Sequence, residues 1–169
     1  MAIANQIYRP SELWKRGARP ASTWASFEKT ILLPSPLVTL RKMGAEAVHI
    51  PGGKIVTKRG PCDFWGAVNG TGRAIVLDAK ECDSRTRFPI GNKTHFPDHQ
   101  RAELIAMGEA GAVSGLLVHA TTFGCQMYLW LSWRHMRTNE PSIAWIDTRW
   151  MHATMIGTGV VDWEEVTGT

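Results

Sequence analysis

One stretch of the sequence, residues 60–81, constrains the fold more than any other, because its pattern is typical of a β-hairpin. Two apolar runs flank a turn that contains Asn69 and Gly70, and both residue types tolerate the positive φ angles that tight turns need. The second run, residues 73–77, is nearly all apolar, as expected of a strand that is covered on both faces. These features favour an α/β fold whose sheet is buried between helices.

Three charged residues interrupt this apolar hairpin. Asp63 lies on the first strand, whereas Asp78 and Lys80 lie two positions apart on the second and therefore share a face. Two carboxylates that converge in a partly dry place repel each other unless a cation joins them, and oxygen ligands favour Mg²⁺ or Mn²⁺. With a lysine beside them, they suit metal-assisted hydrolysis of a phosphodiester. A plainer alternative remains open, in which Asp63 caps a turn and Asp78 and Lys80 form an ion pair at a strand end.

Four short motifs extend this pattern in one order along the chain. They are Asp-Phe-Trp-Gly at 63–66, Leu-Asp-Ala-Lys-Glu at 77–81, Thr-Arg-Phe-Pro-Ile at 86–90 and Asp-His-Gln at 98–100. Together they resemble the RecU family of Holliday junction resolvases, which belongs to the PD-(D/E)xK nuclease superfamily. The resemblance extends from about residue 23 to about residue 130, and it is weak in the first twenty and the last thirty residues. It implies a restriction-endonuclease-like fold, with a central mixed sheet flanked by helices.

The resemblance also implies roles for particular residues. Asp63 and Asp78 would be metal ligands, the carbonyl of Ala79 would be a third ligand, and Lys80 would be the catalytic lysine. Gln100 aligns with a family glutamine and would hold a phosphate or a catalytic water, although an ordinary polar residue at a helix N-terminus explains it as well. RecU proteins usually carry glutamate where Asp78 stands, so the shorter side chain would move the metal slightly.

An acidic residue on the first helix often reaches the metal in this superfamily, and Glu28 stands in the corresponding place. Apolar residues recur at helical spacing over residues 24–31, after a possible cap at Ser22 or Thr23. A surface glutamate is the competing interpretation. Two prolines then interrupt the pattern, and we expect a second helix over residues 37–43, ended by Gly44.

Basic residues mark the candidate DNA contacts. We expect a strand at 45–50, a turn at 51–53 and an extended run at 55–57. RecU proteins insert a stalk between this first strand and the catalytic strand, and only about ten residues are available for it here, so the stalk looks much reduced. Cations in this segment and in the polar loop 82–96 are the predicted phosphate contacts: Lys54, Lys58, Arg59, Arg85, Arg87 and Lys93.

The charge of the chain is unevenly distributed. Residues 1–60 hold ten basic and three acidic residues, whereas residues 61–169 hold nine and twelve. Positive charge concentrated in one part suggests a polyanionic partner, although a solvated basic surface gives the same composition. We expect a basic N-terminal arm at residues 1–21 and a single nuclease domain at residues 22–169.

The second half of the chain predicts a helix opened by Pro97 and two strands, at 112–119 and 126–131. The second strand alternates, and the face that carries Tyr128 and Trp130 is a candidate homodimer contact, with burial under a helix as the alternative. Residues 133–137 are expected to be helical, and the segment after Pro141 carries no clear pattern.

These observations predict a Mg²⁺-dependent Holliday junction resolvase, with Mn²⁺ as a possible substitute, that acts as a homodimer on four-way DNA junctions in recombination and repair. Two alternatives remain: another nuclease of the superfamily that restricts DNA or processes its ends, or a DNA-binding module that cuts nothing. Three cysteines without metal-site spacing favour the reducing cytoplasm of a bacterium or a phage-infected host. No apolar run approaches the length of a membrane span.

Overall fold

The computed structural model describes residues 24–44, 46–50, 54–58, 60–121, 127–153 and 161–168. The predicted N-terminal arm lies outside these residues. Within them, a mixed β-sheet is flanked by helices on both faces, which confirms the predicted α/β class. No helix of the described part has the length and apolar character that crossing a membrane requires.

The central sheet has six strands in the order β1-β4-β5-β7-β8-β10. Its strands are β1 (Val38–Lys42), β4 (Phe64–Val68), β5 (Ala74–Cys82), β7 (Val113–Ala120), β8 (Tyr128–Ser132) and β10 (Trp150–His152). Neighbours are antiparallel except for β5 and β7, which are parallel. A parallel pair needs a crossover connection, and helix α3 (Asp98–Glu109) lies in the one that joins β5 to β7.

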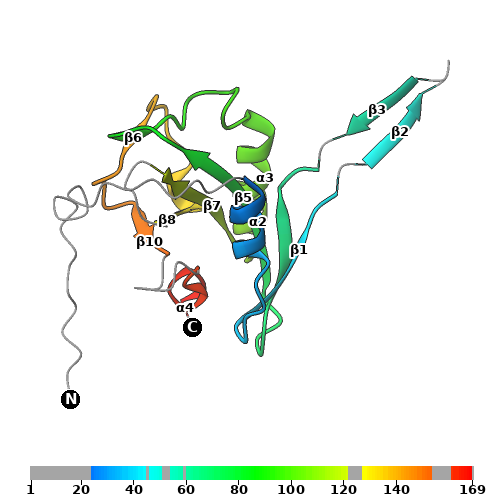
Figure 1. The fold of residues 1–169 in the computed structure, drawn as a ribbon, viewed down its shortest axis with the longest axis horizontal. Helices are drawn as coiled ribbons and strands as arrows, with labels where there is room; N and C mark the ends of the chain where they lie inside the picture. The colour runs from blue at the N-terminus through cyan, green and yellow to red at the C-terminus, as the bar shows by residue number, and fades with distance from the viewer. Residues whose placement is uncertain are drawn as a thin grey trace.

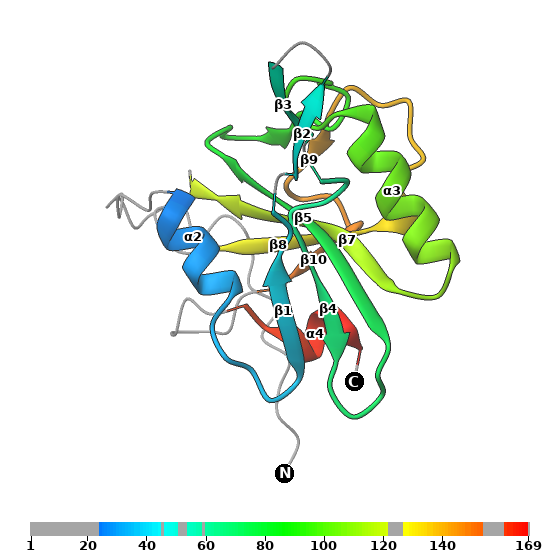
Figure 2. The ribbon, with the colours of Figure 1, turned by 90° about the vertical axis from the view of Figure 1, so that its right-hand side faces the viewer.

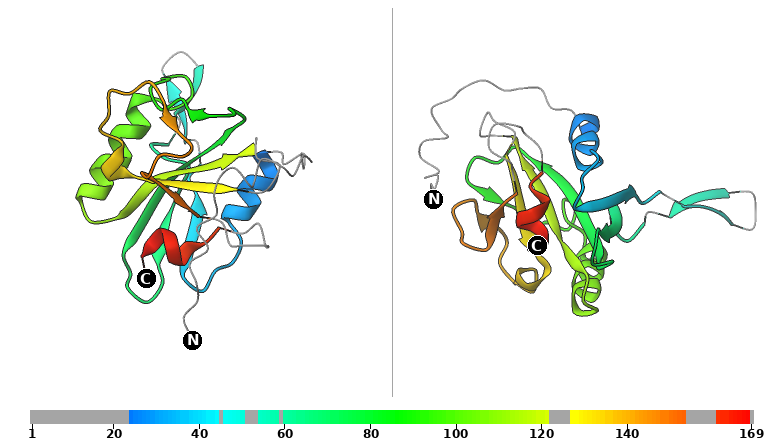
Figure 3. Two further views of the ribbon diagram at one scale, coloured as in Figure 1. Left: turned by 90° about the vertical axis from the view of Figure 1, so that its left-hand side faces the viewer. Right: turned by 90° about the horizontal axis from the view of Figure 1, so that it is seen from below.

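Helices α2 (Trp24–Ile31) and α3 lie on opposite sides of the sheet, as the right-hand view of Figure 3 shows. On β5, Leu77 and Ala79 pack in a core with Phe27 of α2, whereas Val76 packs in a second core with Leu104 of α3. The last helix, α4 (Trp163–Thr167), joins the core on the α2 side. Because β5 is covered on both faces, its first four residues, 74–77, are all apolar.

The hairpin predicted over residues 60–81 is confirmed as β4 and β5. The two strands pair from Phe64 opposite Leu77 to Ala67 opposite Ala74. The connection is longer than a two-residue turn, and its positive φ angles fall on Gly70 (80°) and Gly72 (67°). Glycine adopts this left-handed conformation without a steric penalty.

The helix expected over residues 37–43 is wrong, because these residues form strand β1. All five residues of β1 pair with β4, from Val38 opposite Val68 to Lys42 opposite Phe64. The approach is close at Gly66, where an added Cβ would lie 1.8 Å from the Thr39 carbonyl oxygen. Pairing with the distant strand β4 thus overrides the local helix signals. The β-branched residues Val38 and Thr39 also favour a strand.

A second hairpin projects from the body of the molecule, formed by β2 (Glu46–Ile50) and β3 (Lys54–Lys58) (Figure 1). At its root, the Met43 amide donates to the Asp63 carbonyl at 2.8 Å, and Gly60 packs closely on the Met43 side chain. The strands at 45–50 and 55–57 were predicted, but the projecting segment is longer than expected. The preceding sheet strand ends at Lys42, so the whole of residues 43–63 separates β1 from β4.

The C-terminal part confirms the strands predicted at 112–119 and 126–131. The helix expected over residues 133–137 is only a short 3-10 turn, η2 (Trp133–His135). Beyond it, β9 (Ile143–Ala144) pairs with β6 (Arg87–Phe88), and β10 completes the sheet.

A charge cluster fastens this last segment. The Arg149 guanidinium donates to both oxygens of Asp147, at 2.8 and 2.7 Å, and to both oxygens of Glu140, at 2.7 and 3.0 Å. We call these three residues the Arg149 clamp. They join the turn at Asp147 to the segment that carries Glu140.

Tyr128 and Trp130, the proposed dimer face, are buried within the chain. Their exposed fractions are 1% and 2%, and both pack in the core with Phe27 of α2 and Trp163 of α4. Burial under helices, the alternative interpretation, is therefore confirmed, and this face is not available for a contact between two copies.

Candidate active site

Three elements bring the predicted site residues together at one end of the sheet. Asp63 immediately precedes β4 and lies beside Asp78 of β5, one step beyond the pair of Phe64 and Leu77. Asp78 and Lys80 point to the α3 side of β5, and Gln100 is in the first turn of α3. Sequence positions far apart thus converge because the β4–β5 hairpin and the α3 crossover meet here.

Lys80 contacts every other polar side chain of this group. Its Nζ lies 2.6 Å from Asp78 Oδ2, 3.9 Å from Asp63 Oδ2 and 3.2 Å from Gln100 Oε1. The same Asp63 Oδ2 also accepts a hydrogen bond of 3.0 Å from the Ala79 amide. The group is therefore fixed by a main-chain hydrogen bond at one end and by helix α3 at the other.

Asp78 is the most perturbed group of the site. Its side chain is fully buried, and neither carboxylate oxygen accepts a hydrogen bond of good geometry, despite the close ammonium group. Burial, and then the negative charge of Asp63, raise the pKa of Asp78 to about 8, against the opposing effect of Lys80. One lysine does not compensate two carboxylates at this depth, so the site can take up a further positive charge.

The donor set fits a hard divalent cation. The described residues contain no cluster of three or more His, Cys, Asp and Glu side chains arranged to hold a metal. Two carboxylates can nevertheless bind Mg²⁺, which keeps several waters and uses substrate phosphates as ligands. The Asp78 carboxylate, which lies against Lys80, and the adjacent Asp63 carboxylate would hold such an ion, and the predicted third ligand is the Ala79 carbonyl.

Two residues near the carboxylates were not singled out from the sequence. Burial, followed by the charges of Asp78, Asp63 and Glu103, raises the pKa of the Cys62 thiol to about 12, so this cysteine stays neutral. Glu103 lies on α3, three residues after Gln100, and residues at that spacing share a helix face. That spacing is the signal by which Glu103 could have been found.

His95, in the loop before α3, also lies close to the site. Its ring packs against Phe88 with centroids 5.4 Å apart, and Nε2 is buried without a hydrogen-bond partner in the described structure. Burial and the positive charge of Lys80 lower the pKa of His95, so its imidazole is neutral at physiological pH.

Glu28, the predicted helper on the first helix, has another partner. Both of its carboxylate oxygens lie 2.8 Å from Lys42 Nζ. Lys42 pairs with Phe64, whose buried side chain belongs to the α2 core, so this ion pair lies on the opposite face from Asp78. A role for Glu28 near the metal stays a prediction, and its observed partner favours a structural role.

The predicted DNA contacts fall in two places. Lys54 and Lys58 lie on β3 of the projecting hairpin, whereas Arg59 is outside the described residues. The other three lie in the loop between β5 and α3, where Arg85 is exposed, Arg87 donates to Ser142 Oγ at 2.7 Å, and Lys93 pairs with Asp98 at 2.7 Å. That loop connects Lys80 to Gln100, so these cations border the site in sequence.

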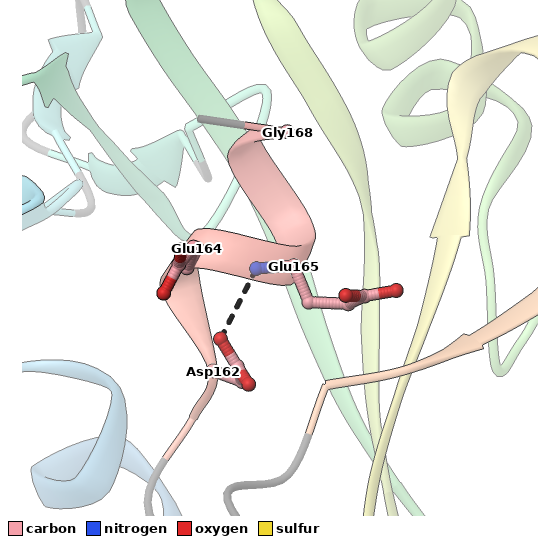
Figure 4. Close-up of a pocket in the computed structure, with 4 residues that line it drawn as sticks. All are labelled: Asp162, Glu164, Glu165 and Gly168. Carbon is pink, nitrogen blue, oxygen red and sulfur yellow. Dashed lines mark hydrogen bonds between the residues drawn. The ribbon is translucent and has the colours of Figure 1, made fainter. Parts of the chain in front are cut away.

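A shallow depression elsewhere on the surface is not part of this site. It is lined by Asp162, Glu164, Glu165 and Gly168, and the Asp162 carboxylate caps α4 by accepting from the Glu165 amide (Figure 4). Helix α4 packs on the α2 side of the sheet, so the depression is separated from Asp78 by the sheet itself.

No family model matches the chain, and a search of curated proteins finds no relative.

Proposed function

We propose that this protein is a Mg²⁺-dependent endodeoxyribonuclease with a restriction-endonuclease-like fold, and that it resolves four-way DNA junctions. The observation that carries the proposal is the buried Asp78 carboxylate, placed against Asp63 and Lys80 with its oxygens left without good hydrogen bonds. A buried carboxylate whose pKa is so strongly raised is typical of a functional site. The resemblance of the four sequence motifs to RecU resolvases points to the same chemistry.

Each side chain of the site has a role in this proposal. Asp63 and Asp78 would hold the cation, and Asp78 would act as a ligand in its deprotonated form. Lys80 lies beside both carboxylates, where its ammonium group can orient a water molecule and neutralise charge on the scissile phosphate. Gln100 fixes the position of Lys80 through their 3.2 Å hydrogen bond. When bound, Mg²⁺ would stabilise negative charge on the phosphate and promote its hydrolysis, which leaves a 5′-phosphate.

Recognition of the junction would use the projecting β2–β3 hairpin and the cations beside the site. The hairpin leaves the body next to Asp63, so a duplex bound at the carboxylates would pass close to it (Figure 1). Lys54, Lys58 and Arg59 belong to this segment, and Arg85, Arg87 and Lys93 belong to the loop after β5. Lysine and arginine contacts to phosphate would supply binding that weakens with salt.

A homodimer would supply the two incisions that resolution needs. Each chain carries one Asp63–Asp78–Lys80 set, and a two-fold dimer presents two such sites with the symmetry of the junction. Sedimentation should report about twice the chain mass at micromolar concentration. On a cruciform plasmid, mixed dimers of the wild type and Asp78→Ala should nick one strand, whereas wild-type dimers should linearise the plasmid. Linearisation by a monomer would contradict the paired arrangement.

The decisive experiment incubates the protein with a synthetic four-way junction and with a linear duplex of the same arms, with and without Mg²⁺. The proposal expects symmetric cuts in the junction that require Mg²⁺ and disappear in Asp78→Ala. Equal cleavage of the linear duplex would instead indicate a restriction or end-processing nuclease. Binding without any Mg²⁺-dependent turnover would indicate a DNA-binding module.

A further inference from the structure

The part of the sheet next to the site carries an exposed tryptophan. Trp65 lies two residues after Asp63, so both side chains point to the α3 side of the sheet, whereas Phe64 and Val68 are buried on the α2 side. Helix α3 packs on β5 and β7 and does not cover this position. The Trp65 side chain is therefore 48% exposed, although it occupies the middle of a sheet strand.

A free cation stands directly across from it. Arg41 of the edge strand β1 is the register partner of Trp65, and side chains opposite each other in an antiparallel pair lie about 5 Å apart at their Cβ atoms. Arg41 is exposed and forms no ion pair within the described part of the chain. Figure 2 shows β1 and β4 side by side, with α3 to one side and the projecting hairpin beyond their upper ends.

We propose that Trp65 and Arg41 form a nucleotide subsite beside the scissile phosphate, an inference that rests on the proposed nuclease function. Trp65 lies about 7 Å along the strand from Asp63. A DNA strand whose phosphate sits at the carboxylates and that leaves away from the hairpin meets Trp65 first. The indole stacks on a base that is unstacked at the branch point, and Arg41 binds the adjacent phosphate. Stacking on an aromatic side chain with a neighbouring cation is the common mode of single-strand recognition.

The chemistry of the surrounding face favours DNA over a second copy of the chain as the occupant. The other large apolar side chains that are exposed in the described structure are Leu32, Leu33 and Ile146, on segments other than β1 and β4. Trp65 thus stands beside a cation rather than within an extended apolar patch, which an interface between copies would favour. Asp63, two residues away, and Asp78 on the neighbouring strand lie on the same face and give the subsite a reacting phosphate to flank.

The test uses a four-way junction in which 2-aminopurine replaces the base next to the cleavage position mapped with the wild type. In the Asp78→Ala background, which keeps the junction intact, Trp65→Ala should weaken junction binding about tenfold and abolish the change in 2-aminopurine fluorescence. Trp65→Phe should restore most of both. Arg41→Ala should lower the log–log salt slope of binding by about one. The matched control is Leu33→Ala, because Leu33 is 46% exposed and follows α2.

The outcomes separate this inference from the proposed function. If the wild type cleaves no DNA with Mg²⁺, the function and the subsite both fail. If it cleaves normally but Trp65→Ala binds the junction with unchanged affinity, only the subsite is overturned. The same follows if Trp65→Ala dissociates dimers without changing the intrinsic affinity for DNA. Should Trp65→Ala fail to fold, Arg41→Ala decides, because an unchanged salt slope and affinity overturn the subsite.

Discussion

Two clusters in this molecule each combine two carboxylates with one cation, but they shift the pKa values of carboxyl groups in opposite directions. The site combines two carboxylates, Asp63 and Asp78, with Lys80, whereas the Arg149 clamp combines Glu140 and Asp147 with one arginine. In the clamp, hydrogen bonds from Arg149 lower the pKa of Asp147 to about 2 and also lower the pKa of Glu140. In the site, burial and the neighbouring carboxylate raise the pKa of Asp78 to about 8.

Geometry and depth account for the difference. A planar guanidinium donates pairs of hydrogen bonds along two of its edges, so one arginine satisfies two carboxylates at once in a partly exposed place. A lysine offers a single point of charge, and Lys80 shares it among Asp78, Asp63 and Gln100. The clamp is complete as it stands, whereas the site gains from a further cation. The two clusters therefore differ in their unmet hydrogen bonds rather than in their composition.

The largest expected effect is on cleavage. Asp63→Ala, Asp78→Ala and Lys80→Ala should each reduce Mg²⁺-dependent junction cleavage by roughly a thousandfold or more, because each removes a group that stabilises charge during phosphodiester hydrolysis. Asp147→Ala is the control from the clamp and should cleave like the wild type at temperatures where it is folded. Single-turnover assays on a labelled junction measure both, and normal cleavage by Asp78→Ala would refute the assignment of the site.

The second effect is on the pH dependence of stability without metal. Folded Asp78 keeps its proton up to about pH 8, whereas the unfolded carboxylate loses it near the ordinary pKa of 3.8. The folded state thus binds more protons across this interval, and the free energy of unfolding should fall as pH rises from 5 to 8, by on the order of 3 kcal/mol. Asp78→Asn should remove this fall.

Urea denaturation in chelator at several pH values measures this effect. His95 and His152, whose pKa values burial lowers, push stability in the opposite direction near pH 6, and the comparison with Asp78→Asn cancels them. The carboxylates of the clamp have lowered pKa values, so their contribution is present above about pH 4 and is lost only in acid. Identical pH profiles for wild type and Asp78→Asn would show that folding does not raise the pKa of Asp78.

The third effect is stabilisation by metal. A cation that binds only the folded protein at ten times its dissociation constant adds about 1.4 kcal/mol, or about 4 °C in melting temperature for a chain of this size. Mg²⁺ or Mn²⁺ should produce this shift in the wild type and in Glu140→Ala/Asp147→Ala. The Asp63→Ala/Asp78→Ala protein should not respond, and an equal response from all three would place the ion elsewhere.

The smallest effect belongs to the clamp itself. Arg149→Ala should lower the free energy of unfolding by about 1 kcal/mol, because a partly exposed ion pair is screened by water. Arg149→Lys should recover little of this loss, since a lysine cannot reproduce the forked hydrogen bonds. Chemical denaturation measures the loss, and a change in cleavage by the folded variants would mean that the clamp also serves the site.

The parts of the structure that the sequence predicted are those with local signals. The β4–β5 hairpin is set by two apolar runs around a turn that contains glycines, and the convergence of Asp63, Asp78 and Lys80 follows from its pleat. Gln100 was assigned through the resemblance of Asp-His-Gln at 98–100 to the RecU family, on a helix that Pro97 was predicted to open. Short stretches of sequence are enough to recognise these features, so they can be predicted without a structure.

The parts that were missed depend on distant partners. Strand β1 looked helical after Pro36, and only its pairing with β4 makes it a strand. The ion pair of Glu28 with Lys42 was not foreseen, because residues 37–43 were expected to form a helix. The role near the metal that the resemblance implies for Glu28 stays a prediction. The Arg149 clamp joins irregular turns, where no periodicity indicates which charges will meet.

The root of the β2–β3 hairpin gives the molecule a mechanical property. The β2–β3 ribbon is attached to the body at one end, where the Met43 amide donates to the Asp63 carbonyl. The close packing of Gly60 on Met43 leaves little slack at that point. A duplex that presses on the far end of the hairpin would therefore apply torque to the same residue whose carboxylate is held by the Ala79 amide. A rotation of the hairpin would then change the angle between the DNA arms and the alignment of the carboxylates together.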